Sequence, residues 1–250
     1  MASDVLDPER ISRERDFHDD RFGDDSARES TGKFYSAVAS ATVQYRESVL
    51  RQTEGDCLEY GCGTGALAFD LAAKGCRSAA IDISPVAIET AETEARERGL
   101  DVRFAEMNAE AMSFEPNSFD LVYGSGILHH LDIERATTEV VRVLRPGGRA
   151  VFLEPLGYNP LINAYRRTTP EMRTVDEHPL LQADLTLIER HSSDFEACFH
   201  GLTSIAAAPL METPIGPQLA SLCRRVDQAL FAVPKVGLLA WMVVIEMTTP

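Results

Sequence analysis

Residues 59 to 65 of this 250-residue chain read Glu-Tyr-Gly-Cys-Gly-Thr-Gly and overlap the end of a short apolar run, Cys57 to Tyr60. A helical pattern follows from Gly65 to Lys74. Glycine suits such a turn because the backbone bends sharply there and a ligand can approach where a Cβ would block it. The stretch therefore predicts a strand, a glycine-rich turn and a helix. The turn either contacts a ligand or only packs the helix on the strand, and both interpretations stay open.

Strand and helix patterns alternate on both sides of this stretch. Such alternation predicts parallel strands joined by right-handed helical crossovers, with a ligand crevice beyond the carboxyl ends of the strands. Apolar runs predict strands at Cys57 to Tyr60, Ser78 to Ile81, Val102 to Ala105, Phe119 to Tyr123 and Arg149 to Leu153. Apolar periodicity predicts helices at Gly65 to Lys74, Ser84 to Arg98 and Ile133 to Leu144.

The regular alternation of strand and helix patterns stops in the C-terminal part of the chain. After Glu154, residues 155–194 are rich in Pro, Arg and Tyr, and we expect them to form a lid over the crevice. A strand, a helix and a strand are expected at Phe199 to Ala207, Pro217 to Phe231 and Leu238 to Thr248. The predicted fold is α/β, a doubly wound Rossmann-like sheet of seven strands, mostly parallel with one antiparallel strand.

The chain divides into two predicted parts. Residues 1–52 hold an acidic, mobile or loosely helical arm and a helix from Gly32 to Arg51, and residues 53–250 form one domain. Phe17, His18 and Tyr35 either cover the ligand crevice or belong to a solvated arm.

Two acids narrow the choice of ligand for the glycine turn. Gly61 to Ala66 fits the GxGxxA form of the dinucleotide fingerprint, so NAD and other adenosine ligands remain open. Asp82 ends the second strand, where a carboxylate can accept both ribose hydroxyls. Glu59 precedes the glycines, where its charge would repel a pyrophosphate but suit an ammonium and a sulfonium. The alternative for Glu59 is a helix-capping or solvent-facing carboxylate.

From Asp56 to about Leu153 the chain resembles the class I S-adenosylmethionine-dependent methyltransferases. The matching motifs, in order, are Glu59 to Gly65, Asp82 with Ile83, Asn108-Ala109-Glu110, Phe119 to Leu131 and Leu144 to Gly148. The resemblance implies that S-adenosylmethionine is the cofactor. It implies cofactor contacts from Glu59, Gly61, Cys62, Gly63, Asp82, Ile83, Asn108, Ala109 and Ser125. Asn108 stands where the family has Asp, which keeps a carbonyl acceptor for the adenine amine but loses the charge.

A histidine and an acid are the candidate catalytic residues. Methyl transfer depends mainly on in-line positioning in a dry site, with a base only where the acceptor must lose a proton. An imidazole is suited to that role, and His129 is the best candidate. In similar small-molecule O-methyltransferases such a histidine pairs with an acid after the fifth strand, which here is Glu154. Alternatively, His129 or His130 caps the helix that starts at Asp132.

Four lid residues are candidate acceptor-binding groups: Tyr158, Arg166, Arg173 and His178. Two arginines could clamp an anionic acceptor through bidentate hydrogen bonds. The alternative is that they pair with nearby acids such as Asp176 and Glu177.

The composition of the chain argues against several classes of function. The formal charge of −15 and an isoelectric point near 4.8 disfavour binding to nucleic acid or anionic lipid. Five cysteines form no metal-type pair, so no metal site is expected, and their odd number predicts reduced thiols and a cytoplasmic location. No transmembrane segment or signal peptide is expected. The sequence does not specify an oligomeric state.

The favoured function is therefore methyl transfer to an oxygen or nitrogen nucleophile of a small molecule. Within the fold, the alternative is carbon methylation of a quinone-like or lipid acceptor, suggested by the apolar stretch Ala229 to Ile245. From other classes, a nicotinamide oxidoreductase and a non-catalytic cofactor-binding module remain open.

Overall fold

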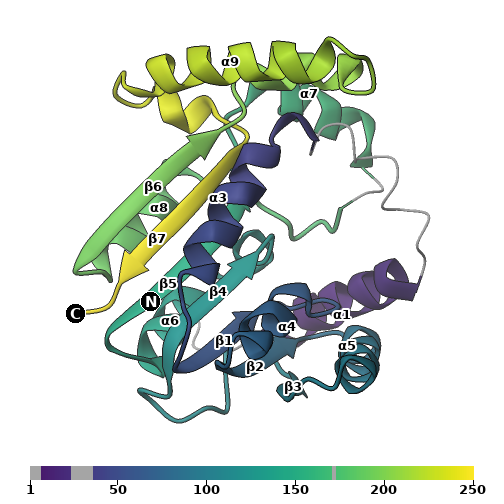
Figure 1. Ribbon diagram of the computed structural model, residues 1–250, viewed down its shortest axis with the longest axis vertical. Coiled ribbons are helices and arrows are strands. Elements are labelled where there is room, and N and C mark those ends of the chain that lie inside the picture. Colours follow the sequence, from purple (N-terminus) through teal and green to yellow (C-terminus); the bar gives the residue numbers. More distant parts are fainter. Residues whose placement is uncertain (1–6, 24–35, 171–172) are drawn as a thin grey trace.

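The computed structural model describes residues 7–23, 36–170 and 173–250 (Figure 1). The strands are β1 Asp56–Tyr60, β2 Arg77–Asp82, β3 Val102–Glu106, β4 Phe119–Ser125, β5 Leu144–Pro155, β6 Asp194–His200 and β7 Met242–Thr248. The α-helices are α1 Pro8–Gly23, α3 Ala39–Leu50, α4 Ala66–Ala73, α5 Pro85–Arg98, α6 Ile133–Val143, α7 Pro160–Thr168, α8 Gln182–Arg190 and α9 Gly216–Phe231. Short 3₁₀ turns are η2 Leu128–His130, η4 Ser204–Leu210 and η5 Val236–Leu239.

The seven strands form one sheet in the order β3-β2-β1-β4-β5-β7-β6. Strands β1 to β5 pair in parallel, whereas β7 is antiparallel to both of its neighbours. The predicted α/β fold, a doubly wound seven-stranded sheet with one antiparallel strand, is confirmed. The strand order reverses between β1 and β4, and such a reversal opens a crevice at the carboxyl ends of the two strands.

Local signals set the helix ends. The Ser84 side chain accepts a hydrogen bond from the backbone N–H of Ala87, Pro85 occupies the first turn of α5, and Gly99 ends the helix with φ +66°. These are standard start and stop residues for a helix, and the predicted range Ser84 to Arg98 follows from them. Helix α3 begins at Ala39, and the predicted start at Gly32 lies outside the described residues.

One predicted strand was wrong in position. The expected strand Phe199 to Ala207 is replaced by β6, which starts at Asp194, and by the turn η4. Gly201 has φ +79°, a conformation that ends an extended strand. The strand therefore lies on the N-terminal side of this glycine.

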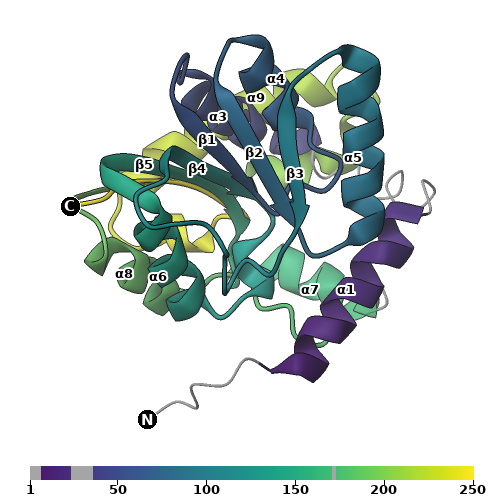
Figure 2. The same cartoon turned by 90° about the horizontal axis from the view of Figure 1, so that it is seen from below.

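The core has a layer on each face of the sheet. Helices α6 and α8 cover one face, and α3 and α4 cover the other (Figure 2). Leu185 and Ile188 of α8 are buried in the same cluster as α6, so the C-terminal portion of the expected lid, 155–194, is a core helix. The segment before α8, including α7, remains on the side of the carboxyl ends.

Helix α1 is docked against the domain. It lies beside α5 in both views (Figures 1 and 2). Arg15 of α1 donates to the carbonyl oxygen of Ile83, and the Arg15 guanidinium lies 2.9 Å from the Glu106 carboxylate. The expected mobile or loosely helical arm is thus a formed helix over residues 8–23. Within the described residues, no helix combines the length and the apolar character that a membrane crossing requires.

Candidate functional site

A cavity of about 650 Å³ opens at the carboxyl ends of β1, β2, β3 and β4. This size suits a small organic ligand or cofactor. Its wall includes most of the predicted cofactor contacts: Gly61, Cys62, Gly63, Asp82, Ile83, Asn108, Ala109 and Ser125. The topology therefore brings together residues from four different strand ends.

The glycine turn is shaped by backbone conformations that glycine favours. Gly61, Gly63 and Gly65 have φ values of +70°, +50° and +82°. A Cβ on Gly61 would lie 2.7 Å from the side chain of Ile127, which is too close for any side chain. The turn thus exposes bare backbone to the cavity, as a closely bound ligand requires.

Asp82 fixes this turn from the end of β2. Its Oδ2 accepts a hydrogen bond from the Gly63 N–H at 2.7 Å, and its Oδ1 accepts one from the Ser84 N–H at 2.9 Å. Burial raises the pKa of Asp82, while the hydrogen bonds from Ser84 and Gly63 oppose that rise. The carboxylate therefore lies in the cavity wall and also supports the loop.

Glu59 lies behind the turn and does not line the cavity. Its Oε2 accepts a hydrogen bond from the Ala68 N–H at 2.8 Å, at the N-terminus of α4. Burial raises the pKa of Glu59 to about 8, although hydrogen bonds from the backbone of Ala68 and Leu67 partly counteract this. The contact is that of the helix-capping alternative, because the side chain turns toward unpaired N–H groups of the helix.

The two residues expected beside an adenine, Asn108 and Ala109, also form local contacts. The Oδ1 of Asn108 accepts a hydrogen bond from the Glu110 N–H at 2.9 Å. The Ala109 carbonyl accepts one from the buried Tyr60 hydroxyl at 2.7 Å. These bonds hold the segment after β3 against the sheet, with Asn108 and Ala109 in the cavity wall.

His129 and Glu154 form a buried pair at the ends of β4 and β5. The His129 Nδ1 lies 2.7 Å from the Glu154 Oε2. The other carboxylate oxygen accepts hydrogen bonds from the N–H groups of Ile127 and Leu128, both at 2.9 Å. A carboxylate accepts hydrogen bonds, so Nδ1 is the donor of this pair, and in the neutral form of the ring Nε2 has the free lone pair.

The helix-capping alternative for the histidines is wrong. Asp132 caps α6 with its own side chain, which accepts a hydrogen bond from the Arg135 N–H at 3.1 Å. The backbone N–H of Asp132 is bound by the Glu110 carboxylate at 2.7 Å. Neither His129 nor His130 is needed for the start of this helix.

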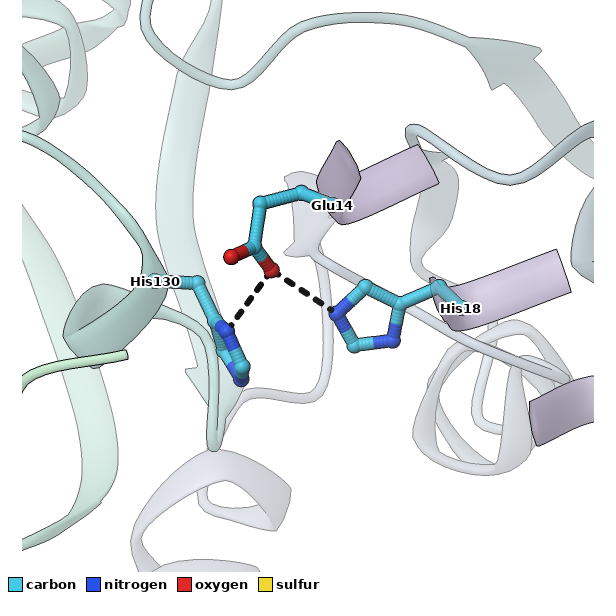
Figure 3. Close-up of side chains that lie close together, drawn as sticks. All are labelled: Glu14, His18 and His130. Carbon is cyan, nitrogen blue, oxygen red and sulfur yellow. Dashed lines mark ion pairs between the residues drawn. The ribbon is translucent and has the colours of Figure 1, made fainter. Parts of the chain in front are cut away.

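Helix α1 supplies part of the cavity wall. Arg10 donates to both carboxylate oxygens of Glu110, at 2.5 and 2.6 Å, and to the His130 carbonyl at 2.9 Å. Glu14 and His18 lie one helical turn apart and face His130 (Figure 3). Of the three residues expected to cover the crevice, His18 lines the cavity and Phe17 does not. The third, Tyr35, lies outside the described residues.

The sequence analysis missed Arg10 and Glu14. The usable signal was the spacing of Glu14 and His18, which places both side chains on one face of a helix. Nothing in the sequence indicated which part of the domain that face would contact.

Comparison with known proteins identifies the domain. Residues 58–152 match the family model described as a methyltransferase domain. The chain is 41% identical over 100 residues to the demethylmenaquinone methyltransferase of Thermus thermophilus, covering 39% of this chain and 46% of that protein. It is 37% identical over 130 residues to an aklanonic acid methyltransferase of Streptomyces sp. strain C5, covering 50% of this chain and 57% of that protein. Residues 58–152 are therefore a methyltransferase domain, with the sequence motifs of the class I S-adenosylmethionine-dependent enzymes.

Solved structures share the fold of this chain. Geranyl diphosphate C-methyltransferase from Streptomyces coelicolor A3(2) superimposes with a TM-score of 0.62 at 14% identity, covering 98% of this chain and 99% of that one. The cyclase SpnF superimposes with a TM-score of 0.55 at 21% identity, covering 83% of this chain and 80% of that one. The chain spans about half the length of the curated relatives quoted above. At such identities the solved structures establish the fold alone.

The family match covers one side of the methyltransferase cavity. Every predicted cofactor contact lies within residues 58–152. By contrast, Glu154, helix α1 and the segment 155–180 lie outside the matched region. The resemblance stated from the motifs is confirmed, and it concerns the part of the cavity wall that residues 58–152 supply.

Of the four predicted acceptor-binding residues, Arg166 and Arg173 line the cavity. Arg173 donates to the carbonyl oxygens of Arg166 and Thr169, at 2.8 and 3.1 Å, so much of its donor capacity is used at the end of α7. Arg173 also lies 3.8 Å from Glu177, one of the two acids named as alternative partners.

The other two predicted acceptor residues are not in the cavity wall. Tyr158 is exposed, and its hydroxyl accepts from the Gln182 N–H at 3.4 Å. His178 is exposed and contacts the site through its backbone, whose N–H donates to the His129 carbonyl at 2.8 Å. Neither side chain therefore takes part in the cavity wall.

Proposed function

We propose that this chain transfers the methyl group of S-adenosylmethionine to an oxygen or nitrogen nucleophile of a small molecule. The observation that carries the proposal is the His129–Glu154 pair, with Nδ1 2.7 Å from a carboxylate oxygen at the wall of the cavity. A histidine held in this tautomer can take a proton from an acceptor through Nε2.

The proposed cofactor position follows the cavity wall. The bare backbone of residues 61–63 would meet the methionine part, and Asp82 would accept the ribose hydroxyls. Ile83, Asn108 and Ala109 would surround the adenine. Support comes from the family match and from the shared cavity. Bound there, S-adenosylmethionine supplies an electrophilic methyl group on a sulfonium.

The role of this chain's residues is then to position and deprotonate the acceptor. His129 removes the proton as the nucleophile attacks, and the Glu154 carboxylate stabilises the imidazolium that results. The buried surroundings exclude water, which strengthens this charge pairing. Holding the reacting atoms in line supplies much of the remaining acceleration.

The acceptor is proposed to be a partly apolar small molecule. Tyr45, Ile162, Trp241 and Met242 line the cavity beyond the glycine turn, while Arg166 adds a cationic group. Such walls suit a ring system with a few polar substituents. The relatives described as aklanonic acid methyltransferase and ubiquinone biosynthesis O-methyltransferase are consistent with this class.

Carbon methylation is a second candidate, favoured by a specific comparison. The relative described as demethylmenaquinone methyltransferase is 41% identical over the aligned region. Of the apolar stretch Ala229 to Ile245, Trp241 and Met242 line the cavity, whereas Val243 to Ile245 are buried in β7. The two candidates differ in the atom that carries the new methyl group.

The test combines binding with turnover. Calorimetry should detect S-adenosylmethionine and S-adenosylhomocysteine and give no signal with NAD. A screen of phenols, carboxylic acids, amines and quinols with methyl-labelled cofactor should then identify an acceptor, and carbon NMR of the product locates the methyl group. Binding of NAD in place of S-adenosylmethionine would overturn the proposal. A product methylated on carbon would select the second candidate.

A further inference from the structure

We propose that Glu14, His18 and His130 form a binding site for a divalent transition-metal ion, with Zn²⁺ the best match. Each residue offers one ligand atom, and the three atoms lie within 4.8 Å of one another (Figure 3). Two of the residues come from α1 and the third from η2. Nothing in the proposed methyl transfer requires this cluster, so the two proposals stand separately.

The distances between the ligand atoms suit one shared ion. The Glu14 Oε2 lies 2.9 Å from the His130 Nδ1 and 3.7 Å from the His18 Nε2. Zinc binds nitrogen and oxygen at about 2.0 to 2.2 Å, so ligands of a tetrahedral ion lie roughly 3.3 to 3.6 Å apart. The observed spacings bracket that range, so small side-chain rotations would complete the site.

Burial gives an independent reason to expect an ion. Glu14 and His130 are 4% and 5% exposed. The Glu14 Oε2 and the His130 Nδ1 form an ion pair at 2.9 Å, but among the described residues neither atom makes a hydrogen bond of suitable geometry. A buried polar atom without a well-aligned hydrogen bond destabilises the fold. A cation between them would satisfy both atoms together.

The ligand types select the class of metal. Two imidazoles with one carboxylate suit zinc or another first-row transition metal, whereas Mg²⁺ and Ca²⁺ favour oxygen ligands. All three residues line the cavity, so a fourth coordination position would face it. This arrangement is that of an open zinc site rather than a closed structural one.

Neighbouring groups would orient the ligands. The second carboxylate oxygen of Glu14 accepts a hydrogen bond from the Thr174 hydroxyl at 2.5 Å. The positive charge of Arg10 is paired with Glu110, which reduces its repulsion of a cation. Partners of this kind fix ligand orientation and commonly affect metal affinity.

A second group, His129, His130 and Glu177, also brings its ligand atoms within 4.8 Å. It is less suitable, because Glu177 lies 3.8 Å from the Arg173 guanidinium and His129 is held by Glu154. Both groups include His130, so a test must distinguish them. An ion at the first group would join α1 to the turn after β4.

The test measures metal binding directly, on full-length protein without a histidine tag and after treatment with a chelator. Titration with Zn²⁺ against a chromophoric chelator should give one ion per chain, and Co²⁺ should give an absorption spectrum typical of nitrogen and oxygen ligands. His18→Ala should raise the dissociation constant at least about 100-fold, since loss of an outer partner alone can cost 10- to 100-fold. Glu14→Gln, which keeps the side-chain shape, should have a similar effect.

His191→Ala is the matched control, because His191 lies at the end of α8 and belongs to neither group. It should leave zinc affinity unchanged. Absence of stoichiometric binding to the wild type would overturn the proposal. So would binding that persists in both His18→Ala and Glu14→Gln. Loss of binding in His129→Ala with retention in His18→Ala would assign the ion to the second group, which also overturns it.

Discussion

His129 and Glu154 are 25 residues apart in the chain, yet the His129 Nδ1 lies 2.7 Å from the Glu154 Oε2. The parallel pairing of β4 with β5 produces this contact, since His129 follows the end of β4 and Glu154 lies near the end of β5. The remaining oxygen of the carboxylate holds the backbone of Ile127 and Leu128. The imidazole is therefore fixed by the same acid that shapes its loop.

Replacement of His129 by alanine is expected to slow methyl transfer much more than it weakens cofactor binding. Loss of a general base typically costs a factor of about 10² to 10⁴ in rate. The measurement is turnover with the acceptor found in the screen, together with the dissociation constant for S-adenosylhomocysteine. The pH–rate profile of the variant should lose its acidic limb. Turnover equal to that of the wild type would leave positioning as the only contribution.

Glu154→Gln should reduce turnover less than His129→Ala does. It should also disturb the loop after β4, whose backbone N–H groups donate to the carboxylate. The amide oxygen can replace one acceptor, whereas its NH₂ group faces donors that the carboxylate had satisfied. Thermal unfolding and turnover should both decline. A variant with normal turnover would contradict the orienting role proposed for this acid.

Asp82→Ala should weaken cofactor binding itself. The variant loses a charged hydrogen-bond acceptor and the support of the Gly63 N–H, at a cost of roughly 1.5 to 3 kcal/mol. Calorimetry with S-adenosylhomocysteine measures this directly. Asp101→Ala is the control, since Asp101 is exposed and lies outside the cavity wall. Equal affinities for the two variants would refute the ribose assignment.

Glu59 predicts a pH dependence of stability. Its pKa is raised from 4.5 to about 8 by burial, so the folded chain keeps a proton between these values that the unfolded chain has lost. The contribution of Glu59 to the free energy of unfolding is therefore greatest below pH 4.5 and declines as pH rises toward 8.

Glu59→Gln should remove this decline while leaving the titration of other groups in place. Urea unfolding of wild type and variant without cofactor, at about pH 5.5 and pH 8, provides the comparison. The wild type should lose more stability than the variant over this interval. An identical loss in both proteins would show that the carboxyl group has no raised pKa.

Arg10→Ala should destabilise the docked position of α1. It leaves the buried Glu110 carboxylate without its guanidinium partner, which we expect to cost roughly 2 to 4 kcal/mol. Hydrogen exchange of residues 8–20 and chemical unfolding measure the effect. Arg13→Ala is the matched control on the same helix, because its ion pair with Asp176 is exposed and should contribute little. Equal exchange in both variants would contradict the anchoring role of Arg10.

The cofactor side was predictable because its signals are local. A strand, three glycines and a helix follow one another within residues 56–73, and Asp82 ends the next strand. Each residue therefore reaches the crevice through the regular geometry of a parallel sheet. The exception is Glu59, whose side chain turned toward the unpaired N–H groups of α4, as the capping alternative had allowed.

The acceptor side was less predictable because long-range contacts determine it. Arg173 uses its donors on the end of α7, and His178 contacts the site through its main chain. The docking of α1 depends on Arg10 meeting Glu110, 100 residues away. No periodic pattern in the sequence encodes such a pairing.

The position of β5 in the sheet has a practical consequence for protein production. The family match ends at residue 152, but one edge of β5 pairs along its length with β7, from Arg149 opposite Thr248 to Pro155 opposite Met242. A fragment trimmed to the matched region would leave that apolar edge unpaired and available to other chains. We expect such a fragment to aggregate on expression. An expressed fragment of this domain should therefore include β7.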